Sequence, residues 1–310
     1  MKVFGMYFIV VGHTFPIGYK SIYAFSVPLF FILSGFVWKE RKFDRKYFRD
    51  SVIQIGVPMV IYALAYTLFK IWHGRLWSAI TVKAVSYWLL EIACGFQGET
   101  GGFQELNLPG LNVCWFLYSL LILRLAFSIL LPLQRKWLIP ITIAISVYWG
   151  YNEIEFCNAW ADAVLMYPFF YLGRWLGNYR ERIEKFNVRS WFSILFLISS
   201  IIVLWFLPDF NDWPKVYMNS YGLNYFLFLI GIFSGTYIIF VVARLLPDKF
   251  IVPLMLIASG NILTLGTHLF WIHLFHKLPI NGSMIQYVYA VIIMVIAYPG
   301  AKLANNHFPI

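Results

Sequence analysis

Histidines within strongly apolar segments are the residues of this sequence whose type and position point to chemistry. His13 ends the run MYFIVVGH, and His268 lies inside the long apolar stretch 251–275. A neutral imidazole can accept a proton from a hydroxyl group, because its unperturbed pKa lies close to physiological pH. Each histidine is therefore a candidate general base, and a histidine that is only hydrogen-bonded inside the fold is the alternative.

Two further polar residues lie where a histidine site could use them. Asp162 stands near the start of the apolar segment 159–177, where it could orient a histidine, bind a substrate hydroxyl, or only reach the polar surface. Lys2 precedes His13 by eleven residues, which is about 16 Å along a helix axis. The histidines include no HxxxH or HExxH pair, so we expect no metal site.

The composition indicates what must position these residues. Of the 310 residues, 61% are hydrophobic and 12% are charged, and the mean hydropathy is +0.71. Soluble domains carry about 25% charged residues, so a soluble globular protein is excluded and the bilayer is the expected solvent. The net charge of +10 comes mostly from short connections between apolar segments. That pattern is typical of membrane topology signals and does not indicate nucleic-acid binding.

We predict an all-α fold, a polytopic transmembrane helix bundle of about ten spans. A span needs about 20 apolar residues to cross a hydrocarbon core about 30 Å thick. The ten predicted segments are residues 3–17, 22–38, 52–72, 112–133, 137–151, 159–177, 190–207, 222–245, 251–275 and 283–304. We expect a single integral-membrane domain over residues 1–310, with an outward loop of about 73–111 that holds a possible interfacial helix at 77–94.

Lysine and arginine cluster in alternate connections between these segments. The connection 39–50 holds six of them, whereas the connection 151–158 holds none. Because cytoplasmic loops carry the excess of basic residues, the alternation predicts an even number of spans and both termini in the cytoplasm. No small-residue cleavage site follows the first apolar segment, so we expect no cleaved signal peptide.

Several short motifs resemble those of one membrane-protein family. IVVGH (9–13) followed by VPLFFILSGF (27–36) resembles the opening of the acyltransferase 3 family. Three later motifs follow in the family's order: CWFLYSLLI (114–122), Asp162 with YPFFYLGRWLG (167–177), and IASGNILTLGTH (257–268). Each motif alone is weak, but five in the right order are fairly specific, and together they cover nearly the whole chain.

The resemblance implies an activity and the residues that carry it. It implies O-acyl transfer, usually of acetyl, from acyl-CoA to a sugar hydroxyl at the cell inner membrane. The family's essential histidine matches His13, its basic residue eleven positions earlier matches Lys2, and its late histidine matches His268. Family members usually carry several more residues before that basic position. We therefore expect a short first helix or a start that lies upstream.

From this we expect acetyl-CoA as co-substrate without a bound cofactor, together with membrane lipid and a carbohydrate or glycolipid acceptor. His13 acts either as general base or as acyl carrier, and His268 orients it or contacts the acceptor. Arginine pairs well with phosphate. The expected acyl-CoA-binding residues are Lys2, Arg41, Lys42, Arg45 and Arg174, which otherwise only set topology. The expected acceptor-binding residues are Asp162, Trp115 and Tyr118, although packing is the commoner role of such aromatics.

Two other functions fit the same composition. A transporter or flippase of polysaccharide intermediates would also have about ten spans and intramembrane histidines, although no internal repeat supports it. A non-catalytic subunit of a glycan-synthesis complex would tolerate a truncated first helix. Consumption of acetyl-CoA separates the enzyme from the transporter, and the importance of His13 separates it from the subunit.

Overall fold

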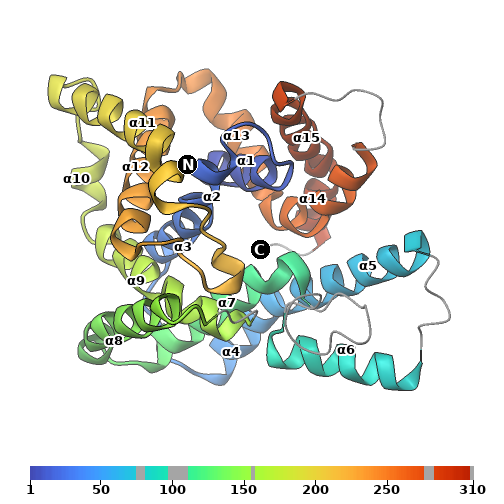
Figure 1. The fold of residues 1–310 in the computed structure, drawn as a ribbon. Helices are drawn as coiled ribbons and strands as arrows, with labels where there is room; N and C mark the ends of the chain where they lie inside the picture. The colour runs from blue at the N-terminus through green and yellow to red at the C-terminus, as the bar shows by residue number, and fades with distance from the viewer. Residues whose placement is uncertain (75–80, 97–110, 155–157, 276–282, 308–310) are drawn as a thin grey trace. The chain divides into compact units, whose positions relative to one another are not determined.

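The computed structural model describes residues 1–74, 81–96, 111–154, 158–275 and 283–307, which are almost entirely helical (Figure 1). In this part of the chain no β-strand occurs, and the one β-bridge joins Phe96 to Asn158. The chain divides into two compact units. Unit 1 holds residues 1–37, 169–215 and 221–310, and unit 2 holds residues 38–168 and 216–220. The expectation of a single membrane domain stays a prediction.

Each of the ten predicted segments overlaps at least one helix. Four helical stretches within the described residues are long and apolar enough to cross a membrane: Tyr19–Val37, Arg45–His73, Trp191–Met218 and Tyr225–Leu245. The pair Asp248–Ser259 and Asn261–Phe275 would make a fifth. Three further apolar helices are shorter: Lys2–His13, Trp115–Ile129 and Met284–Tyr298. The all-α membrane fold is therefore confirmed, while the count of ten crossings and the cytoplasmic termini stay predictions.

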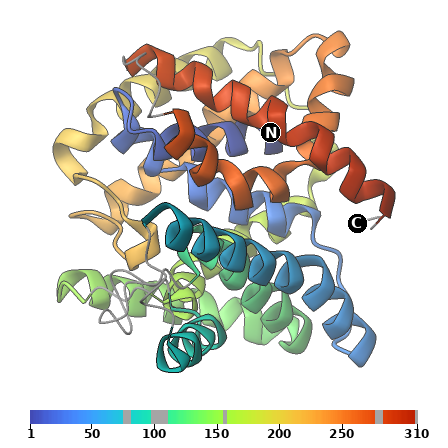
Figure 2. The same cartoon turned by 90° about the vertical axis from the view of Figure 1, so that its right-hand side faces the viewer.

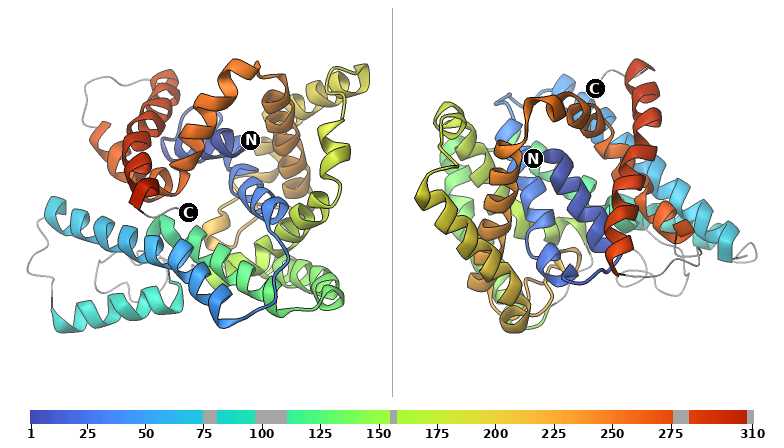
Figure 3. Two further views of the ribbon diagram at one scale, coloured as in Figure 1. Left: turned by 180° about the vertical axis from the view of Figure 1, so that it is seen from behind. Right: turned by 90° about the horizontal axis from the view of Figure 1, so that it is seen from above.

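Unit 1 is built around its N-terminal helix. Helix α1 (Lys2–His13) contacts α2 (Tyr19–Tyr23), α3 (Ser26–Val37), α13 (Ile251–Ser259), α14 (Asn261–Phe275) and α15 (Ser283–His307). Figures 2 and 3 show α14 and α15 side by side, with α1 next to them. The remaining helices of the unit are the second half of α9 (Ala159–Gly177), α10 (Arg180–Glu184), α11 (Trp191–Asn211), α12 (Tyr225–Leu245) and the 3-10 turn η6 (Asp248–Phe250). The first catalytic candidate thus lies on the unit's central helix.

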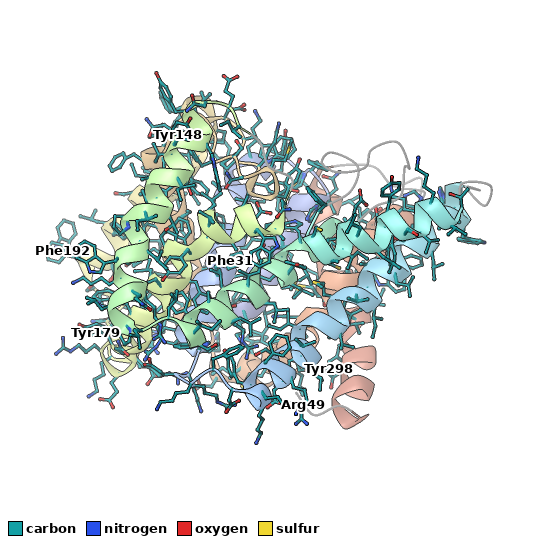
Figure 4. The ribbon with its side chains drawn as sticks, turned by 90° about the horizontal axis from the view of Figure 1, so that it is seen from below. Phe31, Arg49, Tyr148, Tyr179, Phe192 and Tyr298 are labelled. Atoms are coloured by element: carbon teal, nitrogen blue, oxygen red, sulfur yellow. The ribbon has the colours of Figure 1, made fainter. Side chains whose placement is uncertain are left out.

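Large apolar side chains divide between the interior and the outer face of unit 1. Phe31 is fully buried, whereas Phe192 on α11 is 75% exposed and points away from the helices (Figure 4). Phe25, Leu29 and Ile239 form part of a buried cluster against which Phe4 of α1 packs. A helix that is apolar on all sides needs an apolar solvent on its outer face, so the exposed side chains of α11 are suited to lipid.

Helix α1 is shorter than its predicted segment. It ends at His13, and Thr14 caps it, so the expectation of a helix through residue 17 is wrong in its last turn. The cause lies in the sequence that follows. Pro16 disfavours helical backbone at the residue before it, and Phe15 adopts a positive φ of 52°. Tyr287 of α15 donates a hydrogen bond of 2.7 Å to the carbonyl of Ile17, which holds this connection in place.

The predicted segment 251–275 is also not one straight helix. It breaks at Gly260 into α13 and α14, whose axes differ by 71°. Asn261 begins α14 and donates from Nδ2 to the carbonyl oxygen of Lys2 over 3.4 Å. The break therefore brings the start of α14 to the start of α1.

Helices α3 and α9 approach each other through glycines. A Cβ atom added to Gly35 would overlap the carbonyl of Phe170, and one added to Gly173 would overlap that of Ile32. Small residues allow helix backbones to approach this closely. The backbones of the two helices meet where only hydrogen fits.

Unit 2 holds the middle of the chain. Its helices are α4 (Arg45–Ser51), the π-helix η1 (Val52–Gly56), α5 (Val57–Gly74), α6 (Val82–Cys94), η4 (Asn112–Cys114), α7 (Trp115–Ile129), α8 (Pro132–Tyr151), the first half of α9, and η5 (Val216–Met218). Trp88 of α6 donates 3.0 Å to Thr67 of α5. Helix α6 covers most of the helix expected at 77–94, while residues 77–80 and the loop 97–110 lie outside the described residues.

Candidate functional site

The two candidate histidines meet inside unit 1. His13 is the last residue of α1, and His268 lies in the middle of α14. Their ring centroids are 4.9 Å apart with the planes inclined by 50°, so the imidazoles are in direct contact. His268 is completely buried, while His13 is partly exposed. His13 is therefore the more exposed member of the pair, and His268 is the buried one.

A backbone contact assigns the proton of His268. Its Nδ1 lies 2.7 Å from the carbonyl oxygen of Leu265, one turn earlier on α14. A carbonyl accepts only, so Nδ1 must carry the hydrogen, and in the neutral ring Nε2 then carries the lone pair. Nε2 is buried and has no hydrogen-bond partner among the residues described. His268 therefore holds an acceptor available to a substrate or to the neighbouring imidazole.

Tyr23 holds the other imidazole. Its hydroxyl lies 3.3 Å from Nδ1 of His13, and the two rings meet edge to face at 5.9 Å. If Nδ1 donates to the tyrosine oxygen, the lone pair of His13 is on Nε2, which is the arrangement a general base needs. Tyr23 was not among the residues singled out from sequence.

Three further aromatic rings surround Tyr23. Phe15 and Tyr19 precede it in the chain, and Trp213 reaches it from the segment after α11. Trp213 lies 6.0 Å from Phe15, 5.5 Å from Tyr19 and 5.5 Å from Tyr23, measured between ring centroids. We call Phe15, Tyr19, Tyr23 and Trp213 the aromatic cluster. Sequence reasoning missed it, although the pairs Phe15-Pro16 and Trp213-Pro214 mark two connections where aromatic rings leave the helices.

An apolar cavity of about 390 Å³ lies against the other end of α1. Its walls come from α1, α12, α13 and α15. The lining residues are Val3, Phe4, Tyr7, Phe8, Ile238, Ile239, Val242, Leu254, Ile257, Val291, Met294 and Val295. These walls suit a hydrocarbon chain and provide no cation for a phosphate.

The basic residues expected to bind acyl-CoA fall in both units. In unit 1, Lys2 is exposed at the start of α1, and Arg174 donates from Nη1 to Asn178 over 2.6 Å on the last turn of α9. In unit 2, Arg41, Lys42 and Arg45 are exposed around the start of α4. The last three share one short segment, and each has a solvent-facing charge that phosphate could reach.

The residues expected to bind the acceptor all belong to unit 2. Asp162 is completely buried in the first turn of α9, and Trp115 is 8% exposed at the start of α7. Tyr118 donates its hydroxyl to the carbonyl of Ala93 over 2.7 Å and lies 6.1 Å from Trp160. These contacts hold α6, α7 and α9 together, and the role in acceptor binding stays a prediction.

Metal ligands do not gather in the described parts of the chain, where no group of three or more His, Cys, Asp or Glu residues is placed to hold an ion. The groups that the structure does bring together are two adjacent imidazoles and a tyrosine hydroxyl. Such groups can take and return a proton.

Comparisons with known proteins then assign the family. Neither the curated proteins nor the solved structures contain a match to the chain. The family model described as the acyltransferase domain, Acyl_transf_3, matches residues 1–301. That range includes both histidines, all of unit 2, most of unit 1 and all of the motifs noted in the sequence. The resemblance is confirmed: the chain belongs to the acyltransferase 3 family of membrane acyltransferases.

Proposed function

We propose that this protein is an O-acyltransferase that moves an acetyl group from acetyl-CoA to a hydroxyl of a cell-surface or lipid-linked glycan. The observation that carries the proposal is the contact between His13 and His268, at 4.9 Å between ring centroids, in a chain of this family. A pair of imidazoles beside a tyrosine hydroxyl is suited to proton transfer from an alcohol.

In the proposed reaction, His13 Nε2 takes the proton of the acceptor hydroxyl while its Nδ1–H donates to Tyr23. The acceptor oxygen attacks the thioester carbonyl carbon, and a C–O bond forms. The C–S bond then breaks, and the CoA thiolate takes the proton back from His13. An ester and free CoA result, and the histidine returns to its starting state.

His13 could instead act as acyl carrier. Its Nε2 would attack the thioester carbon, the C–S bond would break, and CoA would leave as the thiol with the Nδ1 proton of His13. In that version, His268 Nε2 takes the proton of the acceptor hydroxyl as its oxygen attacks the acetyl carbon, and returns that proton to His13 as the bond between nitrogen and the acetyl carbon breaks. The two versions differ in whether the protein itself becomes labelled by the acetyl group.

The proposed frame is an inner-membrane protein with ten crossings and both termini in the cytoplasm. Acetyl-CoA is a cytosolic anion, so its phosphates need a cytoplasmic basic surface. The proposed donor contacts are Lys2, Arg41, Lys42, Arg45 and Arg174. Asp162, Trp115 and Tyr118 remain proposed acceptor contacts.

The test uses membranes that contain the protein, acetyl-CoA labelled in the acetyl group, and glycans extracted from the host cells. We expect label to enter the glycan, with one free CoA released per acetyl group transferred. Membranes without the protein are the control. Label that stays in acetyl-CoA, with glycan present and the protein folded, contradicts the proposal.

One observation favours a transporter as the second candidate. The 71° break between α13 and α14 resembles the discontinuous helices on which transporters build substrate sites. A transporter would move a glycan intermediate across vesicles without using acetyl-CoA. Glycan transport that is independent of acetyl-CoA would therefore support this candidate in place of the enzyme.

A further inference from the structure

The aromatic cluster has features that helix packing alone does not require. Its four rings come from the connection after α1, from α2, and from the segment after α11, so they gather at ends of helices. Phe15 is 52% exposed. Tyr23 belongs to the cluster and also touches His13 Nδ1. The cluster therefore runs from an exposed ring to the catalytic candidate.

Trp213 contains an unsatisfied donor. Its Nε1 is buried and has no hydrogen-bond partner in the described ranges of the chain. A buried indole N–H normally finds an acceptor, and an unpaired one is costly to keep. An acceptor oxygen from a ligand would satisfy it. Lys215 lies over the indole with its Nζ 5.6 Å from the ring centroid, and its flexible side chain can move aside.

The backbone at Phe15, and at Asp212 next to Trp213, is held in an uncommon conformation. Phe15 and Asp212 both have φ near 52°. For a bulky residue such as phenylalanine, a positive φ is strained, and such strain gathers at functional sites. Glycine would relieve it at position 15. The backbone conformation at position 15 therefore favours glycine, yet the residue there is phenylalanine.

An ion pair borders the rings. Lys20 Nζ donates to Asp212 Oδ1 over 2.8 Å, with the two side chains 38% and 60% exposed. An exposed pair of this kind adds little to stability. Its ammonium and carboxylate can instead donate to and accept from hydroxyl groups. Aromatic faces next to such polar groups are the combination that binds a molecule with both apolar C–H faces and hydroxyls.

We propose that the aromatic cluster and the Lys20–Asp212 pair form the binding site for one sugar ring of the acceptor. The ring lies against Phe15 and Tyr19, Trp213 Nε1 donates to one of its oxygens, and the hydroxyl to be acylated points past Tyr23 to His13. The placement of the acceptor hydroxyl toward His13 rests on the proposed acyl transfer. The site itself is a carbohydrate-binding site whatever reaction follows.

The first variant, Trp213→Phe, keeps an aromatic ring and removes the N–H. We expect the glycan concentration for half-maximal label transfer to rise about 10-fold, the effect of losing one hydrogen bond to a buried donor. The maximal rate and the half-saturating acetyl-CoA concentration should stay as in the wild type, because only acceptor binding is lost. Trp205→Phe on α11, where the indole is 73% exposed, is the matched control.

The second variant, Phe15→Gly, tests whether the Phe15 ring binds the sugar or only packs against the neighbouring aromatic rings. Glycine accepts the positive φ, which offsets part of the ring contacts that are lost, so the thermal unfolding temperature in detergent should fall only slightly. We expect the half-saturating glycan concentration to rise several-fold because a stacking face is lost. Unchanged acceptor half-saturation in both variants, with a working wild type, overturns the acceptor site and leaves the proposed function standing.

A binding measurement keeps the site testable without the reaction. Extracted glycan should raise the thermal unfolding temperature of the purified wild-type protein, and should raise it less for Trp213→Phe. That result without any label transfer would contradict the proposed function and support the carbohydrate site. Equal shifts for the wild type and Trp213→Phe would contradict the site.

Discussion

Arg135 in unit 2 and His268 in unit 1 are both buried ionisable side chains, but their surroundings differ. In unit 2, Arg135 is 7% exposed, and its Nη1 lies 2.7 Å from Glu40. Its guanidinium also lies over the rings of Trp38 and Phe127, at 5.2 Å and 5.7 Å from their centroids. In unit 1, His268 is completely buried and leaves Nε2 without a hydrogen-bond partner among the described residues.

This difference in hydrogen bonding distinguishes a buried polar group that stabilises the fold from one that is available for chemistry. The charge of Arg135 is compensated by an anion and two aromatic faces, which is what a buried cation needs to stabilise a fold. An unpaired buried acceptor instead costs about 1–3 kcal/mol. The Nε2 atom of His268 therefore adds no stability to the fold. Its use lies in the contact of His268 with His13.

The largest effect that sharpens this comparison is expected for His268→Asn. The asparagine amide can still donate to the carbonyl of Leu265, but the acceptor at the position of Nε2 is gone. We expect label transfer to fall about 100-fold, within the range for loss of a general acid–base group, while thermal stability stays close to wild type. Loss of stability together with wild-type specific activity would place His268 with Arg135, as a structural residue.

The second effect is expected on stability. Arg135→Ala removes the ion pair and the contacts with Trp38 and Phe127. We expect the free energy of unfolding to fall by about 2 kcal/mol, since Glu40 is half-exposed and can be hydrated when it is left alone. Thermal unfolding in detergent measures the change.

Arg135→Lys is the matched control for that variant. Lysine keeps the charge but lacks the planar group that lies over the rings, so it should recover only part of the stability. Activity per folded molecule should be unchanged in both variants. A loss of activity without a loss of stability would mean that Arg135 takes part in the reaction.

The smallest effect is expected for Tyr23→Phe. It removes the hydroxyl that lies 3.3 Å from His13 Nδ1 and keeps the aromatic ring. We expect the maximal rate to fall about 10-fold, because the histidine loses the group that fixes its tautomer and orientation. A changed pH profile of the maximal rate would show that Tyr23 acts through His13. An unchanged profile and rate would make the contact structural only.

The helices were predictable where long apolar runs supplied them. The predicted segment 190–207 lies almost entirely on α11, and the predicted segment 222–245 lies largely on α12. The end of α1 and the break at Gly260 were not predicted, because hydropathy reports neither the backbone limit that Pro16 imposes nor the low helix propensity of Gly260. Local chain geometry, more than apolarity, sets those two boundaries.

The candidate site was predictable only in part. His13 and His268 stood out singly as polar residues in apolar segments, but their contact joins positions that no local pattern links. Tyr23 and Trp213 are aromatic residues in a chain in which 20% of residues are aromatic, so their type carried no signal. Only the fold reveals that Trp213 lies beside Tyr23 and that its indole N–H has no hydrogen-bond partner among the residues described.

The most direct test of the central claim compares the wild type with His13→Ala and His73→Ala in the labelled acetyl-CoA assay. His73 is an exposed histidine at the end of α5, so its loss is the matched control. We predict that wild type and His73→Ala transfer label to glycan equally and that His13→Ala transfers it about 10³-fold more slowly. Transfer by correctly inserted His13→Ala at the wild-type rate would contradict the account.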